Sequence, residues 1–358
     1  MKKKLTFLGI ETSCDETAAA VVQENGDGTA NVLSNVIASQ IKEHEKFGGV
    51  VPEVAARAHI ENIDFIIQQA LDKSKKKIED VDGVAATAGP GLVVCLNVGH
   101  NIGKSLAAFS EKPFLSINHL EGHALSPGIE NKISFPYLLL LVSGGHSQYL
   151  IIKDINDYKQ IGTTIDDAVG EAFDKTAKIL GLGYPGGPQI EKFAKLGDKK
   201  SYNLPEPIIN RGGCNLSLAG LKTAVLRKSK EISSNKEKYN LAASFQETIN
   251  KILLKKTEVA MKKFREEITN NSQRPFVVAG GVAANETIRK NLKELSKKMD
   301  FNPIFPSKEF CGDNAAMIAW AGIQRYKKRL FNVKNDLVRS RWPLDADAPF
   351  LKGPGLKL

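Results

Sequence analysis

Cysteine is scarce in this sequence of 358 residues. The four cysteines, Cys14, Cys95, Cys214 and Cys311, lie far apart and form no CxxC pair. This spacing argues against a disulfide framework and against a zinc site made of cysteines. It suits a protein of a reducing compartment.

Long apolar runs are lacking as well. No stretch of the sequence reaches the roughly 18 continuous apolar residues that a membrane span requires. Residues 5–10 are too short for the core of a signal peptide. We therefore predict a cytoplasmic protein with no membrane partner. The chain also has no low-complexity linker, which favours two rigid lobes around a cleft over loosely tethered domains.

The balance of charge is positive. The sequence has 50 Lys and Arg against 40 Asp and Glu, a formal net charge of +10, which favours a polyanionic partner such as a nucleic acid. Many lysines, Lys255 and Lys262 among them, fall on predicted helix faces, where they would simply keep the surface soluble. Charge alone leaves both interpretations open.

Two segments share one pattern: an apolar strand, a polar turn and a second apolar strand. They are residues 6–22 and 137–152, and each is typical of a hairpin that opens a lobe. The repetition predicts a duplicated lobe, and the helices that alternate with further strands predict α/β sheets. We expect an N-terminal lobe at 1–131, a C-terminal lobe at 132–330 with a helical insertion at about 190–267, and a C-terminal extension at 331–358.

Periodicity predicts a helix within residues 54–71, followed by a buried strand at 84–87. Four apolar residues of that helix recur at helical spacing and would share its buried face: Ile60, Ile63, Ile67 and Leu71.

Capping patterns place helices in the second half of the chain. Thr164 and Asp167 resemble a capping box that opens a helix, and Gly181 would end it. A helix is predicted over residues 285–299, and another starts near Asp313.

His119 and His123 stand four residues apart, so on a helix both imidazoles would point from one face and could share a metal ion. Asp313 could provide a third ligand. Two simpler interpretations stay open. The histidines could be satisfied by hydrogen bonds alone, and an aspartate ahead of an apolar helical run often only caps that helix.

Zinc peptidases carry a glutamate directly beside a metal-binding histidine. In the HExxH and HxxEH motifs this glutamate is the general base. Here Glu121 lies midway between His119 and His123, so neither motif is met. The sequence therefore argues against peptide hydrolysis.

Two glycine turns, Ser143-Gly-Gly-His146 and Gly280-Gly281, would let backbone amides approach phosphate oxygens. Each is weak evidence alone, because most glycine turns only satisfy backbone geometry. Gly103-Lys-Ser105 resembles the end of a P-loop, but Val98 stands where that motif requires glycine. Asp174 could accept hydrogen bonds from a ribose, or it could be a surface carboxylate.

Nine motifs, in order along nearly the whole chain, resemble the bacterial tRNA threonylcarbamoyladenosine transferases. Together they are far more specific than any one alone. The motifs are Ile10-Glu-Thr-Ser-Cys-Asp-Glu-Thr17, Phe47-Gly-Gly-Val-Val-Pro-Glu53, Arg57-Ala-His59, Gly89-Pro-Gly-Leu92, Asn118-His-Leu-Glu-Gly-His123, Leu141-Val-Ser-Gly-Gly-His146, Gly170-Glu-Ala-Phe-Asp-Lys175, Tyr184-Pro-Gly-Gly-Pro188 and Asp313-Asn-Ala-Ala-Met-Ile318.

The resemblance implies an α/β fold of the ASKHA type, like that of actin, sugar kinases and Hsp70, with duplicated RNase H-like lobes. It implies transfer of an L-threonylcarbamoyl group from L-threonylcarbamoyl-adenylate to N6 of the adenosine beside the anticodon, with release of AMP. The tRNAs would read codons that begin with A. The implied protein partners are an inactive paralogue of the same fold and a small P-loop ATPase.

The resemblance also implies site residues. His119, His123 and Asp313 would hold one divalent metal ion per chain, iron(II) in the first place and zinc as the alternative. A general base does not follow from it: Glu11 and Asp15 are candidates only if they face the cleft, so the catalytic residue is left unassigned. The residues that would contact the donor are Val142, Ser143, Gly144, Gly145, His146, Asp174, Gly187 and Asn285.

Several positions depart from the family pattern. Glu206 occupies a usual arginine, Glu191 a usual donor-binding aspartate and Gly312 a common threonine. The stretch Cys214-Asn-Leu-Ser-Leu-Ala-Gly-Leu-Lys-Thr223 stands where relatives typically read Asp-Phe-Ser-Phe-Ser-Gly-Leu-Lys-Thr. None of these departures removes a predicted metal ligand.

Three other functions stay in view. A metal-dependent glycoprotein endopeptidase is disfavoured by the position of Glu121. A small-molecule kinase of the same fold would consume ATP without tRNA. A noncatalytic partner subunit should lack the histidine pair, which is present here.

Overall fold

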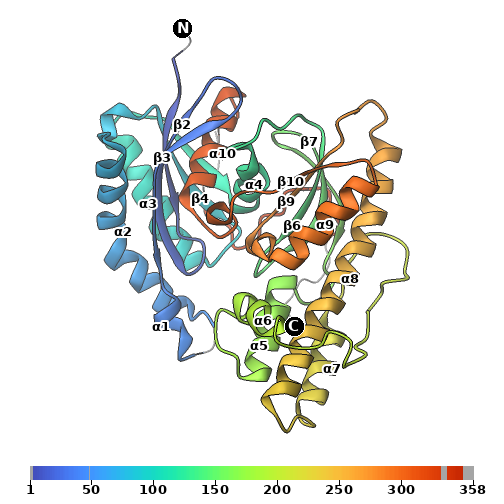
Figure 1. The fold of residues 1–358 in the computed structure, drawn as a ribbon. Helices are drawn as coiled ribbons and strands as arrows, with labels where there is room; N and C mark the ends of the chain where they lie inside the picture. Colours follow the sequence, from blue (N-terminus) through green and yellow to red (C-terminus); the bar gives the residue numbers. More distant parts are fainter. Residues whose placement is uncertain (1–2, 48, 332–336, 350–358) are drawn as a thin grey trace. The chain divides into compact units, whose positions relative to one another are not determined.

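The structure, a computed structural model, describes residues 3–47, 49–331 and 337–349. The chain divides by its contacts into two compact units. The first comprises Met1–Ile133 and Gly312–Ala346, and the second comprises Ser134–Cys311 and Asp347–Leu358. Each unit is built on a five-stranded sheet (Figure 1). Within the described ranges, no helix is long and apolar enough to cross a membrane.

The first unit begins with a hairpin, as predicted, and continues with alternating helices and strands. Its strands are β1 (Thr6–Glu11), β2 (Glu16–Glu24), β3 (Ala30–Ser39), β4 (Gly83–Gly89) and β5 (Phe114–Asn118). Its helices are α1 (Ile41–Glu45), α2 (Pro52–Ser74), α3 (Val93–Phe109), α4 (His119–Leu125) and α10 (Ala315–Lys327), with 3-10 turns at Ile78–Asp80 and Ser126–Gly128.

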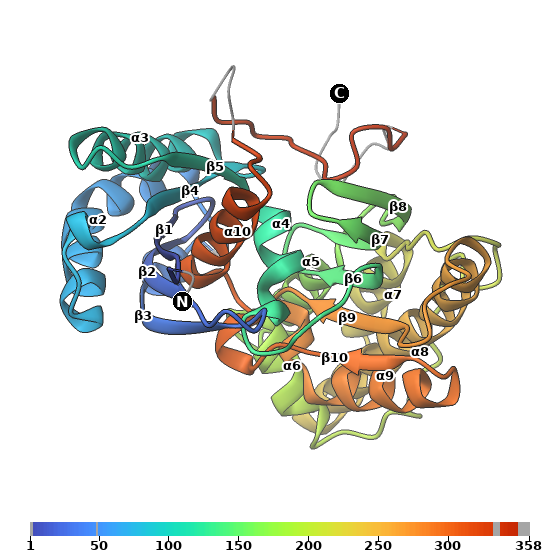
Figure 2. The same ribbon diagram turned by 90° about the horizontal axis from the view of Figure 1, so that it is seen from above.

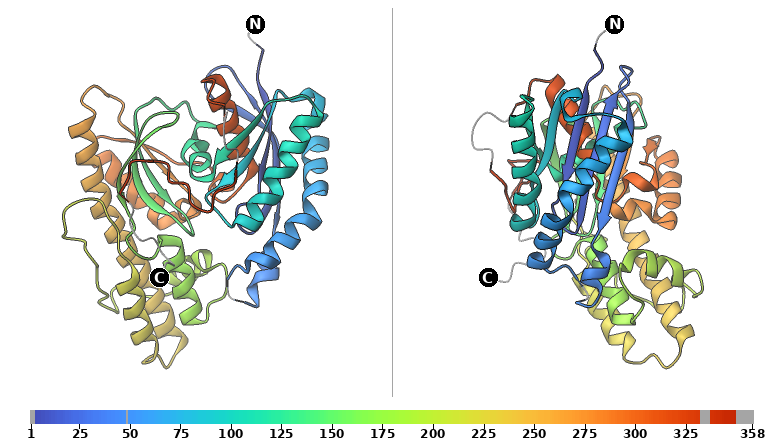
Figure 3. Two further views of the ribbon diagram at one scale, coloured as in Figure 1. Left: turned by 180° about the vertical axis from the view of Figure 1, so that it is seen from behind. Right: turned by 90° about the vertical axis from the view of Figure 1, so that its left-hand side faces the viewer.

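The second unit also opens with a predicted hairpin. Its strands are β6 (Tyr137–Val142), β7 (Ser147–Asp154), β8 (Asp157–Thr163), β9 (Pro275–Ala279) and β10 (Asn302–Ile304). Its helices are α5 (Val169–Leu180), α6 (Gly186–Ala194), α7 (Ala219–Ser229), α8 (Asn235–Glu267) and α9 (Glu286–Lys298), with 3-10 turns at Gly281–Ala284 and Lys308–Phe310. Helix α7 and the first part of α8 extend together beyond the sheet, and the later part of α8 runs alongside it (Figure 3).

The two sheets have the same topology. The first has the order β3-β2-β1-β4-β5, and the second, read in the same sense, has the order β8-β7-β6-β9-β10. In both, the first three strands of the unit pair antiparallel, the fourth strand pairs parallel with the first, and the fifth pairs parallel with the fourth. This is an RNase H-like sheet present twice, and the predicted duplication and ASKHA-type α/β fold are confirmed.

Both faces of the first sheet are covered by helices (Figure 2). On one face, Leu8 and Ile10 join a buried cluster with Ile63 of α2 and Ala107 of α3. On the other face, α10 approaches so closely that a Cβ atom at Gly9 would lie 2.2 Å from the carbonyl oxygen of Ala315. Glycine is therefore required where this helix meets the central strand.

Helix α10 belongs to the first unit by its contacts, although it follows Ser134–Cys311, the main segment of the second unit, in the sequence. The sequence had suggested a single C-terminal lobe from 132 to 330. Apolar residues fill α10 from Ala315 to Ile323, and they are buried against β1, β2 and β4. Part of the expected extension at 331–358, namely 332–336 and 350–358, lies outside the described residues.

Two local predictions were wrong. Ile60 lies on α2 as expected, but it is 64% exposed, because the face that packs on the sheet is made by Ile63, Ile67 and Leu71. The helix expected to open at Thr164 begins only at Val169, because the Thr164 hydroxyl donates to the carbonyl oxygen of Asp167 and closes a turn of its own. Its predicted end at Gly181 is confirmed.

Candidate metal centre and donor-binding loops

Helix α4 carries both predicted histidines on one face. It starts directly after β5, and the side chain of Asn118 caps it by accepting a hydrogen bond from the amide of Leu120 at 2.9 Å. The rings of His119 and His123 meet edge to face, with their centroids 4.7 Å apart. The spacing of four residues therefore brings the two imidazoles together as predicted.

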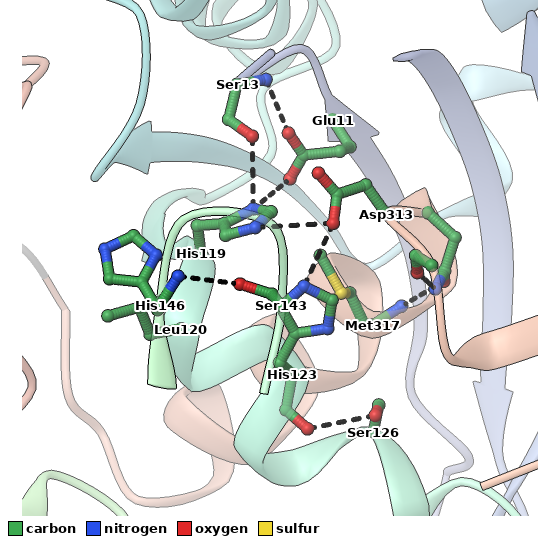
Figure 4. A network of polar contacts seen from close by, with 12 residues as sticks. Glu11, Ser13, His119, Leu120, His123, Ser126, Ser143, His146, Asp313 and Met317 are labelled. Atoms are coloured by element: carbon green, nitrogen blue, oxygen red, sulfur yellow. Dashed lines mark hydrogen bonds and ion pairs between the residues drawn. The ribbon is translucent and has the colours of Figure 1, made fainter. Parts of the chain in front are cut away.

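Asp313 lies beside this histidine pair (Figure 4). Its Oδ1 atom is 3.0 Å from Nε2 of His123 and 3.5 Å from Nε2 of His119. It does not cap α10, because Asn314 takes that role and accepts from the amide of Met317 at 3.0 Å. The simpler interpretation of Asp313 as a helix cap is therefore wrong, and its carboxylate faces the two imidazoles.

A second layer of hydrogen bonds orients His119. Its Nδ1 atom lies 3.1 Å from Oε2 of Glu11 and 3.2 Å from the Ser13 hydroxyl. Glu11 itself accepts from the Thr87 hydroxyl and from the amide of Ser13, both at 2.5 Å. A carboxylate that holds the outer nitrogen of a histidine fixes the ring and turns its other nitrogen toward a ligand position.

The charges at this centre favour a bound cation. Burial acts to raise the pKa of Asp313, but the neighbouring His119 and His123 outweigh it and hold that pKa well below its usual range. Burial acts in turn to lower the pKa of His119, and the carboxylates of Asp313 and Glu11 raise it well above its usual range. Two carboxylates facing one imidazole thus favour a positive charge at this point, which a protonated His119 or a bound cation can supply.

His119, His123 and Asp313 could hold a metal ion, since one ligand atom from each lies within 4.8 Å of the others. Two imidazoles and one carboxylate form a ligand set used for iron(II) and for zinc. Among the described residues, Nδ1 of His123 is buried without a hydrogen-bond partner, which leaves Nε2 as the nitrogen directed at Asp313. The residues present therefore fit the metal that the sequence suggests.

Glu121, between the two histidines, is not available as a base. Its two carboxylate oxygens accept from Nη1 of Arg325 at 3.2 and 3.1 Å. Only 1% of Glu121 is exposed. A carboxylate held in a buried ion pair cannot activate water for peptide hydrolysis, which agrees with the sequence argument against a peptidase.

In the second unit, Val142 ends β6 and Ser143–His146 form the turn into β7. The Ser143 amide donates to the carbonyl oxygen of His146 at 2.8 Å, and the His146 amide contacts the Ser143 hydroxyl at 3.2 Å. A Cβ atom at Gly144 or Gly145 would meet no atom within 4 Å. Hydrogen bonds between Ser143 and His146 thus hold the ends of the turn, and its two glycines have free space around them.

Gly280 lies directly against the end of β6, where the Ser143–His146 turn begins. Its φ angle is 92°, and a Cβ atom there would lie 2.4 Å from the carbonyl oxygen of Val142. The Gly280-Gly281 sequence is therefore a close backbone approach that seats the start of α9 beside the end of β6.

The other predicted donor contacts lie on helices of the second unit or at a helix start, and Asp174 and Asn285 make structural hydrogen bonds. Oδ1 of Asp174 accepts from the amide of Gly186 at 2.7 Å. Asn285 caps α9 through Ile288 and donates to Gln246 at 2.9 Å. Gly187, in the first turn of α6, has open space around its Cα. Whether these residues and the Val142–His146 turn contact a donor stays a prediction.

Comparison with known proteins gives the family. The model of the TsaD family, tRNA N6-adenosine threonylcarbamoyltransferase, matches residues 31–320. The chain is 57% identical to the tRNA N6-adenosine threonylcarbamoyltransferase of Pelagibacter ubique over 358 residues, which is 100% of both proteins. It is 49% identical to the enzyme of that name from Brucella anthropi, over 98% of each protein. The chain belongs to the tRNA N6-adenosine threonylcarbamoyltransferase family.

The fold of this threonylcarbamoyltransferase is shared more widely. A crystal structure of T. kodakarensis HypF aligns with a TM-score of 0.60 at 14% identity, and it covers 94% of this chain and 49% of that one. Full-length HypF, solved in a phosphate- and nucleotide-bound form, aligns with a TM-score of 0.57 at 14% identity, over 92% of this chain and 47% of that one. At this identity the likeness concerns the fold alone.

The positions that depart from the threonylcarbamoyltransferase pattern have local partners. Asn215 accepts from the amide of Thr163 at 3.0 Å, and Glu206 lies 3.5 Å from Nζ of Lys251. Glu191 accepts from the amide of Glu286 at 2.8 Å, and so adds to the N-terminal capping of α9. A Cβ atom at Gly312 would meet no atom within 4 Å, so this glycine is not required by packing.

Sequence reasoning missed Glu11 as the partner of His119. The motif Ile10-Glu-Thr-Ser-Cys-Asp-Glu-Thr17 contains Glu11, but it suggests this residue only as a candidate base. It is completely buried and its oxygens contact Ser13, Thr87 and His119, so it serves as an orienting group. A charged residue at the end of an otherwise apolar strand was the available signal.

Proposed function

We propose that this chain transfers an L-threonylcarbamoyl group from L-threonylcarbamoyl-adenylate to N6 of the adenosine beside the anticodon of tRNA, with release of AMP. The observation that carries the proposal is the convergence of His119, His123 and Asp313 in a member of this family. We expect tRNAs that read codons beginning with A. The high proportion of Lys and Arg, with a formal net charge of +10, suits a tRNA substrate.

We propose that these three residues hold one divalent metal ion, iron(II) in the first place. Two histidines and one carboxylate are the usual protein ligands of non-haem iron(II), and zinc accepts the same set. When bound, the ion would supply Lewis-acid polarisation of the carbamoyl carbonyl or stabilisation of the departing phosphate. Glu11 would keep the ring of His119 in the orientation that directs Nε2 to the ion.

The proposed donor contacts are Val142–His146, Asp174, Gly187 and Asn285. The amides of Gly144 and Gly145 lie in a turn with open space around both glycines, which suits the approach of phosphate oxygens. Asp174, whose Oδ1 atom accepts from the amide of Gly186, carries a carboxylate of the kind that accepts hydrogen bonds from ribose hydroxyls.

In the proposed reaction the adenine amine attacks the carbamoyl carbon. The new N–C bond forms as the C–O bond to the AMP phosphate breaks, and the amine gives up one proton. Glu11 is committed to three partners and is not the base, so this role stays unassigned. An adenosine in an anticodon loop can be splayed out of its stack, which makes its amine accessible.

We propose that the enzyme works in the cytoplasm with two protein partners, an inactive paralogue of the same fold and a small P-loop ATPase. Another enzyme would make the adenylate.

The proposal is tested by transfer of labelled threonylcarbamoyl from the adenylate to an unmodified tRNA transcript. We expect label at the anticodon-adjacent adenosine, lost with chelator and restored by iron(II). The assay is run with and without the two partners, and a transcript with guanosine at that position is the control. Absence of product with partners of proven activity would contradict the proposal.

A further inference from the structure

Glu121 points away from the two histidines between which it lies. Successive residues of a helix turn by about 100°, so residues four apart share a face and the residue midway between them lies on the opposite face. There Glu121 meets Arg325, with both of its oxygens within 3.2 Å of one guanidinium nitrogen. Glu121 is 1% exposed and Arg325 is 8% exposed, so the ion pair is buried.

Arg325 belongs to the helix that follows Asp313. From the start of α10 at Ala315 to Arg325 the helix rises about 15 Å. Asp313, just before that start, faces the histidines, and Arg325, near its end, holds Glu121. Helix α10, together with Asp313 two residues before its start, therefore contacts both faces of α4.

The middle of α4 is packed tightly between these two contacts. A Cβ atom at Gly122 would lie 2.9 Å from Cδ1 of Ile318 and 3.2 Å from Cγ of Met317. This contact fixes the distance between the helices, but it is apolar and does not fix the rotation of α4 about its axis. The Glu121–Arg325 ion pair fixes this rotation, because it is a directional contact on the face of α4 opposite the histidines.

We infer that the Glu121–Arg325 ion pair is a positioning device for the metal ligands His119 and His123. A rotation of α4 by about 10° would move groups roughly 5 Å from its axis by about 1 Å. Metal–ligand distances tolerate about 0.2 Å. A buried ion pair contributes little net stability compared with apolar side chains of the same size. Its main effect here is therefore to set the rotation of α4 about its axis.

The inference rests on the proposed metal role and is tested on the full chain with cobalt(II) as the metal. Affinity is measured by competition with a chelator, ligand geometry by the visible absorption of the bound cobalt, and stability by thermal unfolding of the metal-free protein. We expect Glu121→Gln to weaken cobalt binding by about 10- to 100-fold and to change the spectrum.

The matched control is Glu24→Gln. Glu24, on β2, pairs with Lys327 at 2.6 Å, two residues beyond Arg325 on the same helix, and is 9% exposed. This variant breaks an ion pair at the same end of α10 without touching α4. We expect it to bind cobalt within about twofold of the unchanged protein, with an unchanged spectrum.

A second variant separates positioning from folding. Glu121→Gln leaves the buried guanidinium of Arg325 without the Glu121 carboxylate, and Arg325→Met removes that positive charge. In the double variant the thermal stability should therefore recover, while the affinity for cobalt stays low. Equal affinity in Glu121→Gln and Glu24→Gln, or full recovery of affinity in the double variant, would overturn the inference. An unchanged protein that binds no cobalt, or binds it equally after His119→Ala and His123→Ala, would instead overturn the proposed metal site.

Discussion

Nε2 of His123 lies 3.0 Å from Oδ1 of Asp313, although 190 residues separate the two in the sequence. His119 directs its own Nε2 at the same oxygen from 3.5 Å. One carboxylate oxygen thus faces two imidazole nitrogens. The negative charge of Asp313 and, in neutral imidazoles, the lone pairs of the two Nε2 atoms are directed at the same point. A divalent cation at that point would satisfy all three groups.

The charge of Asp313 should be essential for this centre. Asp313→Asn keeps the shape of the side chain but removes its negative charge, and we expect metal affinity to fall by about 100-fold or more. Competition with a chelator measures the loss. Asp82→Asn, in an aspartate of the same unit that pairs with Lys3, is the control and should leave affinity unchanged. Equal affinity in the two variants would exclude Asp313 as a ligand.

Glu11 should act through His119 and not through its own contact with substrate. Glu11→Gln keeps a hydrogen-bond acceptor but loses the charge, and we expect metal affinity to fall about 10- to 100-fold. Thr87→Val removes one donor to the same carboxylate and leaves its charge, so its effect should be smaller. If both variants retain full metal affinity while transfer is lost, Glu11 acts in the chemical step itself and not through His119.

His59 should make the stability of the metal-free protein depend on pH. It is completely buried, with Nδ1 bonded to the Thr17 hydroxyl at 2.7 Å and Nε2 to the carbonyl oxygen of Cys14 at 3.0 Å. Burial lowers the pKa of His59 below its ordinary value of 6.5. As the pH falls, His59 therefore binds a proton in the unfolded chain before it does so in the folded protein.

The contribution of neutral, buried His59 to the free energy of unfolding is complete above about pH 6.5. It is lost as the pH falls below this value, by at most about 1.4 kcal/mol per pH unit. Denaturant unfolding between about pH 7.5 and pH 5.5 measures the slope. The variant His59→Gln cannot take up this proton, so its free energy of unfolding should decline less steeply than that of the unchanged protein. Parallel declines would show that His59 is protonated equally in the folded and unfolded states.

Asn285 should contribute to stability as well as to any donor contact. Asn285→Ala loses the cap of α9, which costs about 1 kcal/mol, and it leaves the buried Gln246 without this partner, which costs a further 1–3 kcal/mol or so. Ser234→Ala removes only the cap of α8 and should cost about 1 kcal/mol. Chemical unfolding compares the two, and an equal loss would contradict a structural role for the Asn285–Gln246 bond.

The local relationships were predictable from the sequence. Both hairpins, the strand at 84–87 and the shared face of His119 and His123 follow from periodicity, because the residues concerned are close in the chain. Ile60 was wrongly expected to be buried, since the face of α2 that turns inward is decided by the sheet on which it packs.

The distant relationships were not predictable in this way. Glu121 and Arg325 are 204 residues apart, and no local pattern pairs them. Asp313 was suggested as a ligand, but only the structure shows that Asn314 is the cap and that the carboxylate faces the histidines. The lobe limits at 131 and 132, the insertion at 190–267 and the donor contacts stay predictions.

The placement of α10 in the first unit has a consequence for synthesis on the ribosome. The first sheet leaves the exit tunnel early, yet the helix that covers its second face is translated only after Ser134–Cys311, the main segment of the second unit. At about 5–20 residues per second, the 190 residues between His123 and Asp313 take roughly 10 to 40 s. During that interval the nascent histidine pair has no aspartate partner and the central strand is uncovered, so this half of the protein matures last although it is made first.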